Sequence, residues 1–203
     1  MICLDPFKNI NIVKQGETVS VSPCCLMSAQ QVDTIDFYNN RYLTQIRNSF
    51  IEGEPSVQCQ NCTRATGSNN WYIDHGYNNI EVELVRMDYW VGNTCNLRCV
   101  ICNPVNSSSW GQELGLPNRK QNVNDFWKTI NLEKIKFIHF SGGEPLLSKE
   151  HVEFLKEIPN PTEVEINYNT NGTILPSKRY HLLLVLTSHF FQGYLSHDLD
   201  RCF

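Results

Sequence analysis

Residues 84–102 read LVRMDYWVGNTCNLRCVIC, and this stretch decides the predicted fold. Its first half is rich in apolar and aromatic residues and predicts a strand from Leu84 to Val91, followed by a turn at Gly92. Three cysteines then follow with the spacing C-x3-C-x2-C. Three thiolates on one loop can bind three irons of a 4Fe–4S cluster and leave the fourth iron open, and open coordination positions are where metal sites do chemistry.

Two more glycine-containing segments follow predicted strands. The apolar, β-branched and aromatic run from Ile135 to Phe140 predicts a second, buried strand, and Val164 to Tyr168 is predicted as a third strand. Ser-Gly-Gly-Glu-Pro (141–145) comes after the second strand, and Thr-Asn-Gly (170–172) comes after the third. The segments between the strands predict short helices, at residues 125–130 and 149–158. Strands that alternate with helices predict an α/β fold with a parallel sheet, whose ligand-binding loops lie beyond one edge.

The three motifs, in this order, resemble those of the radical SAM superfamily. The resemblance implies a partial (βα) barrel in which Cys95, Cys99 and Cys102 hold a 4Fe–4S cluster. The open iron would bind S-adenosylmethionine (SAM), whose reductive cleavage gives a 5′-deoxyadenosyl radical that abstracts hydrogen from an unknown substrate, with a peptide or protein among the candidates. An electron donor such as a flavodoxin or ferredoxin is implied. The SAM-contacting residues by this resemblance are Gly142, Gly143, Glu144, Pro145 and Asn171. Glu144 can accept a charge-assisted hydrogen bond from the SAM ammonium group.

The N-terminal segment carries five more cysteines, around a predicted hairpin (9–22) and a helix that Asn39 or Asn40 caps. This small hairpin/helix segment resembles the SPASM and twitch regions of radical SAM proteins, which hold auxiliary iron–sulfur clusters but usually follow the core. An auxiliary site could use Cys3, one of Cys24 or Cys25, Cys59 and Cys62. Zinc is the alternative, because C-x2-C suits tetrahedral zinc equally well. A zinc site that pairs Cys59 and Cys62 with Cys99 and Cys102 is a further alternative.

The predicted domains are a SPASM/twitch-like segment (1–84) and an incomplete radical SAM core (85–203). Residues 63–80 are polar and rich in Asn and Gly, which predicts an irregular linker. The tail changes character near residue 178, and the family core has more βα units than this chain has room for. We therefore expect a truncation or an altered reading frame near residue 178, so that the C-terminal half of the core is missing; the alternative is a small protein that a partner chain completes. With half of the core missing, SAM binding by this chain alone is expected to survive better than SAM cleavage.

Composition narrows the class of protein. The net charge of −4 gives no basic excess, so a nucleic-acid partner is not expected. No apolar run is long enough for a membrane span and no signal peptide is evident, so the expected location is cytoplasmic. Nine cysteines in such a chain indicate metal binding rather than disulfides. The alternative function is a non-catalytic iron–sulfur or zinc-binding fragment. His139, inside an apolar strand, is predicted to be a hydrogen-bonded core residue.

Overall fold

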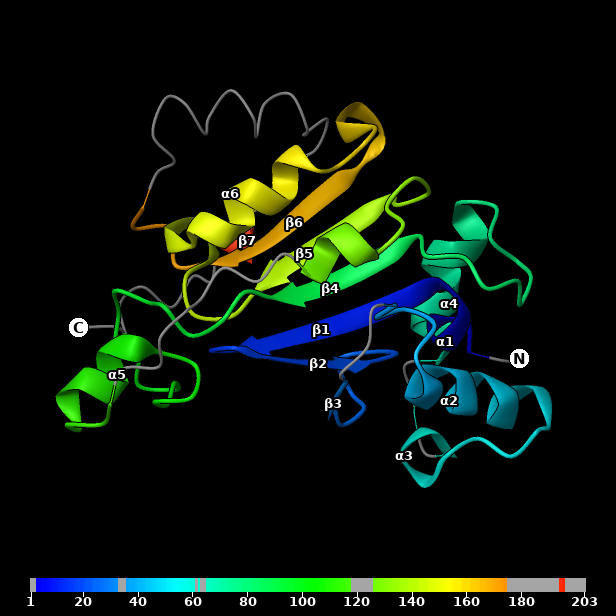
Figure 1. The fold of residues 1–203 in the computed structure, drawn as a ribbon, viewed down its shortest axis with the longest axis horizontal. Helices are drawn as coiled ribbons and strands as arrows, with labels where there is room; N and C mark the ends of the chain where they lie inside the picture. Colours follow the sequence, from blue (N-terminus) through cyan, green and yellow to red (C-terminus); the bar gives the residue numbers. More distant parts are fainter. Residues whose placement is uncertain are drawn as a thin grey trace.

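The computed structural model describes residues 3–32, 36–60, 62, 65–117, 126–174 and 194–195. Seven strands in this part of the chain form a twisted sheet in the order β3-β2-β1-β4-β5-β6-β7 (Figure 1). The strands are β1 (Asn9–Gln15), β2 (Thr18–Ser22), β3 (Gln30–Gln31), β4 (Arg86–Trp90), β5 (Phe137–Ser141), β6 (Glu165–Thr170) and β7 (Tyr194–Leu195).

The predicted α/β architecture is confirmed by the second half of the sheet. Strands β4, β5 and β6 occupy the three predicted strand segments and pair in parallel, and β7 pairs in parallel with β6. Helical segments lie between these strands: α5 (Ser108–Glu113) and η1 (Phe126–Thr129) between β4 and β5, and η2 (Pro145–Leu147), α6 (Lys149–Lys156) and η3 (Pro161–Glu163) between β5 and β6. Because the strands are parallel, their carboxyl ends point to the same edge, toward α5 (Figure 1). Closure of this sheet into a partial barrel stays a prediction.

The N-terminal segment continues the same sheet. Strands β1 and β2 pair antiparallel around a turn in which Gly16 has φ of +65°. Strand β1 also pairs in parallel with β4, with Ile12 opposite Tyr89. The N-terminal and C-terminal segments therefore share one hydrogen-bonded sheet. The division into domains at residue 84 stays a prediction. The N-terminal helices are α1 (Asp5–Lys8), α2 (Arg41–Ile51), α3 (Val57–Gln60) and α4 (Ala65–Asp74).

Two local signals explain the N-terminal helices. The Asn40 side chain accepts a hydrogen bond from the Leu43 amide, so of the two predicted candidates, Asn39 and Asn40, it is Asn40 that caps α2. The prediction of an irregular linker over residues 63–80 is wrong, because α4 occupies much of it. Burial of Tyr72 and a hydrogen bond from the Leu4 amide to Asn69 Oδ1 (3.0 Å) anchor α4 to the start of the chain. Tertiary contacts thus override a polar, Asn-rich composition.

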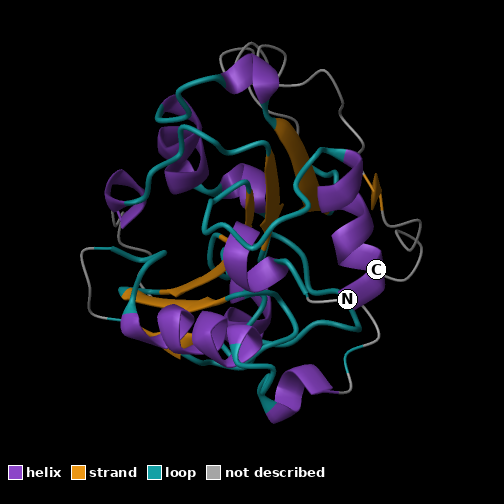
Figure 2. Cartoon of the chain, turned by 90° about the vertical axis from the view of Figure 1, so that its right-hand side faces the viewer, coloured by secondary structure: helices purple, strands orange, loops and turns teal. Residues whose placement is uncertain are grey.

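The core lies on one face of the sheet. Alternate residues of the central strands are fully or almost fully buried there and pack under α6 and η1: Ile10, Ile12, Met87, Tyr89, Ile138, Phe140, Ile166 and Tyr168. Side chains alternate between the faces of a strand, so the intervening positions face the other way. On the central strands these positions are mostly polar, as with Asn9, Arg86, Asp88 and His139. Figure 2 shows the strong twist of the sheet with helices around it.

Two further sequence predictions concern the C-terminal tail and membrane spans. The predicted change near residue 178 lies outside the described residues. Within the described ranges, no helix has the length and apolar character needed to cross a bilayer.

Candidate functional site

The loop that bears Cys95, Cys99 and Cys102 directly follows β4, and helix α5 holds its backbone. The Cys95 amide donates to Ser108 Oγ (3.0 Å), and Ser109 Oγ donates to the Cys95 carbonyl (2.7 Å). Trp110 Nε1 donates to the Cys99 carbonyl (2.9 Å). Side chains at the start of one short helix therefore fix the backbone at the first two cysteines.

The three thiols of this loop are each half-buried. Burial raises the pKa of the Cys102 thiol, with a smaller contribution from Cys95. Among the described residues, no three His, Cys, Asp or Glu side chains stand close enough to share a single metal ion. A 4Fe–4S cluster makes a different demand, because each thiolate binds a different iron. A C-x3-C-x2-C loop with three half-buried thiols fits that demand.

Gly142 and Gly143 lie against the loop that leads from β4 to the cysteines. The Gly143 amide donates to the Gly92 carbonyl (2.9 Å), and the Glu144 amide donates to the Thr94 carbonyl (2.7 Å). A Cβ atom at Gly143 would lie 2.4 Å from the Thr94 carbonyl oxygen. Gly142 has φ of +122°, a conformation that favours glycine. The two glycines thus let two strand-end loops interlock.

Glu144 is fully buried and joins the ends of β5 and β6. Its carboxylate accepts hydrogen bonds from Thr170 Oγ1 (2.9 Å), the Asn171 amide (2.8 Å) and the Leu146 amide (3.0 Å). Pro145 follows as the first residue of η2, which Glu144 caps. These contacts make Glu144 a positioning residue in this structure. The Glu144 carboxylate thus already accepts hydrogen bonds from three protein donors. A further hydrogen bond from the SAM ammonium group to this carboxylate stays a prediction.

Asn171 links the end of β6 to the cysteine loop. Its Nδ2 donates to Asn96 Oδ1 (3.0 Å) and lies 3.8 Å from Cys95 Sγ. Asn96 Nδ2 in turn donates to Thr173 Oγ1 (2.8 Å). Segments 92–99, 142–145 and 170–173 are therefore one connected unit at the carboxyl ends of three adjacent strands, as expected for a parallel sheet.

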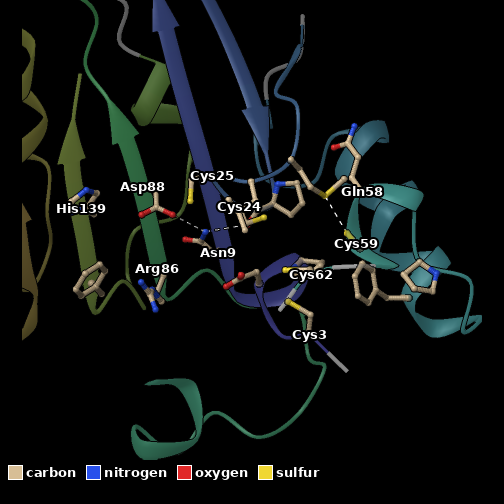
Figure 3. Close-up of a pocket in the computed structure, with 18 of the residues that line it drawn as sticks. Cys3, Asn9, Cys24, Cys25, Gln58, Cys59, Cys62, Arg86, Asp88 and His139 are labelled. Atoms are coloured by element: carbon tan, nitrogen blue, oxygen red, sulfur yellow. Dashed lines mark hydrogen bonds between the residues drawn. The ribbon is translucent and has the colours of Figure 1, made fainter. Parts of the chain in front are cut away.

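The five N-terminal cysteines line one cavity of about 720 Å³, shown in Figure 3. They are Cys3, Cys24, Cys25, Cys59 and Cys62. Burial is the main cause that raises the pKa of Cys3 to about 12 and that of Cys24 to about 11. Protonated thiols would have to lose their protons to bind a metal ion. Whether these cysteines bind iron–sulfur or zinc stays a prediction.

The cavity lies at the opposite end of β4 from the other cysteine loop. Arg86 and Phe137, the first residues of β4 and β5, are part of its lining. The length of β4, roughly 15 Å at about 3.3 Å per residue, separates this end from the loop that bears Cys95. The structure therefore contradicts a zinc site that pairs Cys59 and Cys62 with Cys99 and Cys102.

The cavity wall includes polar residues that sequence reasoning did not single out, namely Asn9, Arg86 and Asp88. His139 also lines this wall, half-buried and directly opposite Asp88 in the strand register, so its prediction as a core residue is wrong. Burial lowers the pKa of His139, and Asp88 acts in the opposite direction. The available signal was the alternation of polar residues with Met87, Tyr89 and Ile138.

Comparisons with known proteins indicate an iron–sulfur protein, as the spacing of the three cysteines does. Residues 83–180 match the family described as a 4Fe-4S single cluster domain. The probable GTP 3′,8-cyclase of Methanocella arvoryzae is 34% identical over 86 residues, which are 42% of this chain and 26% of that protein. The GTP 3′,8-cyclase of Helicobacter pylori is 39% identical over 88 residues, 42% of this chain and 26% of that protein.

A longer match joins this chain to the GTP 3′,8-cyclase of Pelotomaculum thermopropionicum, with 33% identity over 102 residues, 48% of this chain and 30% of that protein. The chain thus covers less than a third of the length of each of these relatives. The matches support an iron–sulfur protein and the resemblance to radical SAM enzymes.

Proposed function

We propose that this chain forms the cluster-binding and SAM-binding part of a radical SAM enzyme. The observation that carries the proposal is the connected unit at the carboxyl ends of β4, β5 and β6. The Glu144 amide and the Asn171 side chain tie the other two loops to the cysteine loop, through the Thr94 carbonyl and Asn96 Oδ1. Cys95, Cys99 and Cys102 would hold a 4Fe–4S cluster. When bound, the cluster and SAM supply a 5′-deoxyadenosyl radical for hydrogen abstraction from a substrate.

The protein's own residues would orient the cofactors. Gly142, Gly143, Glu144, Pro145 and Asn171 would lie around SAM, with Glu144 holding the backbone of its neighbours in place. Asn171 Nδ2, at 3.8 Å from Cys95 Sγ, would donate a weak hydrogen bond to a cluster ligand. Hydrogen bonds to cluster sulfurs shift reduction potentials, so Asn171 is also placed to tune electron transfer from a flavodoxin or ferredoxin.

The cavity at the other end of β4 supports a second metal site. Cys3, one of Cys24 or Cys25, Cys59 and Cys62 would supply four thiolates, for an iron–sulfur cluster or, as the alternative, zinc. A single zinc ion would require these thiols to move closer together, because no three of them stand close enough to share one ion in the described part of the chain. The substrate candidates are a peptide or protein, from the resemblance to SPASM and twitch proteins, and a nucleotide, from the relatives named GTP 3′,8-cyclase. Turnover by this chain alone is part of the proposal to be tested.

Anaerobic reconstitution tests both metal sites in one experiment. Replacing Cys95, Cys99 and Cys102 with alanine should abolish one 4Fe–4S cluster, because three of its ligands are lost. Cys202→Ala, a matched thiol outside both groups, should retain full iron and sulfide. Metal that remains in the triple variant reports the N-terminal site, and elemental analysis identifies it as iron or zinc. An unchanged low-temperature EPR signal in the triple variant would contradict the assignment.

Activity is tested by adding dithionite and SAM to the reconstituted chain. SAM should bind to the wild-type chain and to Cys202→Ala but not to the triple variant, and any 5′-deoxyadenosine that chromatography detects should depend on Cys95, Cys99 and Cys102. A sample that carries the cluster but neither binds nor cleaves SAM would favour the alternative function, a non-catalytic iron–sulfur protein.

A further inference from the structure

Two adjacent cysteines leave the N-terminal ligand set open, because only one of Cys24 and Cys25 is needed to make four thiolates. The two thiols differ in their surroundings. Cys25 is exposed, whereas Cys24 is half-buried and packs against the main hydrophobic core. Figure 3 shows Cys25 on the side of Asp88, across the cavity from Cys59. A ligand has to face the other ligands, so the orientation of the two side chains distinguishes them.

A tight turn after β2 sets these orientations. The Met27 amide donates to the Cys24 carbonyl (3.3 Å), which closes a four-residue turn with Cys25 and Leu26 at its tip. Cys25 and Leu26 are both exposed, Leu26 at 53%. Ser22 Oγ also donates to the Cys24 carbonyl (2.9 Å), so the first residue of the turn is held at the end of β2. The turn therefore presents Cys25 at the mouth of the cavity and keeps Cys24 at its base.

Cys24 lies among the other cysteines of the cavity. Burial is the main cause that raises the pKa of Cys3, and Cys24 and Cys59 add to it, so these three thiols are near one another. Burial also raises the pKa of Cys24, while hydrogen bonds from the backbone amides of Leu26 and Met27 act in the opposite direction. Hydrogen bonds of this kind favour the thiolate, which is the form of cysteine that binds metal.

Helix α3 brings the C-x2-C segment to the same turn. The Ser28 amide donates to Gln58 Oε1 (3.1 Å). Cys59 Sγ lies 3.6 Å from Met27 Sδ, at the end of the turn. The Cys62 amide donates to the Cys59 carbonyl (3.2 Å), so the two cysteines of the segment lie within one turn of the chain. These contacts hold the turn after β2 against the C-x2-C segment.

The spread of the thiols indicates the group that they bind. Zinc needs all of its ligands around a single ion, with each sulfur at about 2.3 Å. Within the described ranges, no three His, Cys, Asp or Glu side chains are close enough for one ion. In an iron–sulfur cluster each thiolate of a four-cysteine set can bind a different iron. A cavity of about 720 Å³ has room for such a group. A cluster therefore fits thiols that are spread apart, and it leaves a fifth thiol with no iron to bind.

We propose that Cys24, and not Cys25, completes this ligand set, and that the bound group is an iron–sulfur cluster. The four ligands are then Cys3, Cys24, Cys59 and Cys62. Cys25 stays at the mouth of the cavity as a thiol that binds no iron. This ligand set rests on the second metal site of the proposed function.

A matched pair of variants tests the ligand set. Both are made in the full chain with Cys95, Cys99 and Cys102 replaced by alanine, so that only metal at the N-terminal site is counted. After anaerobic reconstitution with iron, sulfide and zinc, Cys25→Ala should keep the iron, the sulfide and the low-temperature EPR signal of this parent background. Cys24→Ala loses one of four ligands, so it should bind less iron and sulfide and change the signal.

Alkylation of the reconstituted wild-type chain is a second measurement, and it needs no variant. Iron coordination blocks the reaction of a thiolate with iodoacetamide, so metal removal with a chelator should raise the alkylation rate of Cys24 at least about tenfold. The rate at Cys25 should change by less than about twofold, because its exposed thiol is accessible in both samples. Tandem mass spectrometry distinguishes the two neighbouring residues.

Four results would overturn the proposal: loss of the cluster in Cys25→Ala, an unchanged cluster in Cys24→Ala, zinc without sulfide at this site, or an alkylation rate of Cys24 that metal removal does not change. The first three leave metal bound in the parent background, so the second metal site of the proposed function stands. Absence of both iron and zinc from the parent background would contradict that site as well.

Discussion

Gly143→Ala would force apart the two loops on which the proposed cofactor site depends. The new Cβ would lie 2.4 Å from the Thr94 carbonyl oxygen and 2.7 Å from the Asn93 carbonyl carbon. Both are backbone atoms, so neither can move away by changing a rotamer. The loop that leads to Cys95 must shift, or the alanine variant must fold less tightly.

The magnitude follows from the contacts at this junction. The hydrogen bonds from the Gly143 and Glu144 amides to the neighbouring loop are each worth about 1 kcal/mol, and overpacking costs at least about 1 kcal/mol more. We expect the free energy of unfolding to fall by about 3 kcal/mol and the iron content per chain to fall with it. Gly111→Ala is the control, because nothing lies within 4 Å of its Cβ position in α5.

Urea unfolding followed by circular dichroism measures the free energy, and iron and sulfide analysis after anaerobic reconstitution measures cluster binding. Gly111→Ala should match the wild type or gain up to about 1 kcal/mol, since alanine favours helix over glycine. The reasoning is refuted if Gly143→Ala unfolds within about 0.5 kcal/mol of the wild type and binds the same amount of iron.

Two further predictions concern the buried polar groups under α6. Lys14→Met should lower the free energy of unfolding by about 3–5 kcal/mol, because it leaves the buried Glu150 without its ion pair. The double variant Lys14→Met, Glu150→Leu should lose much less in urea titrations, and equal losses would contradict this explanation. Burial lowers the pKa of His151 to about 3, so stability should be full above pH 6.5 and fall by about 1.4 kcal/mol per pH unit as pH drops toward 3. His151→Gln should lose this slope in unfolding curves between pH 7 and pH 5; an unchanged slope would assign it to other groups.

The sequence predicts the elements that carry strong local signals. β5 is rich in apolar and aromatic residues, and β6 alternates Ile166 and Tyr168 with polar residues. Both strands end at glycine-containing turns, and α2 has an Asn cap before an amphipathic stretch. The parallel pairing of β1 with β4 has no such signal, because it joins Asn9 to Arg86 across a long separation in the chain. Helix α4 was missed because its stability comes from Tyr72 and Asn69 contacts rather than from helix propensity.

Some features of the candidate site can also be predicted from the sequence, and others cannot. The spacing of Cys95, Cys99 and Cys102 can be read directly, and so can the glycine pair at residues 142–143. The partners of Glu144 cannot, since its carboxylate is bonded to Thr170, 26 residues further along the chain. His139 was misjudged because a polar residue in an apolar strand can face either a core or a cavity. Only the register of β5 against β4 decides between these two faces.

The pairing of β1 with β4 limits where further strands can join the sheet. Strand β4 has a hydrogen-bonded neighbour on each side, β1 and β5, so both of its edges are used. Any additional strand, from this chain or from another, must therefore join at an outer edge, beside β3 or beyond β7. A strand added beyond β7 would continue the row of parallel strand ends that begins at the cysteine loop. A strand added at β3 would extend the antiparallel hairpin instead, so the two outer edges offer different pairing partners.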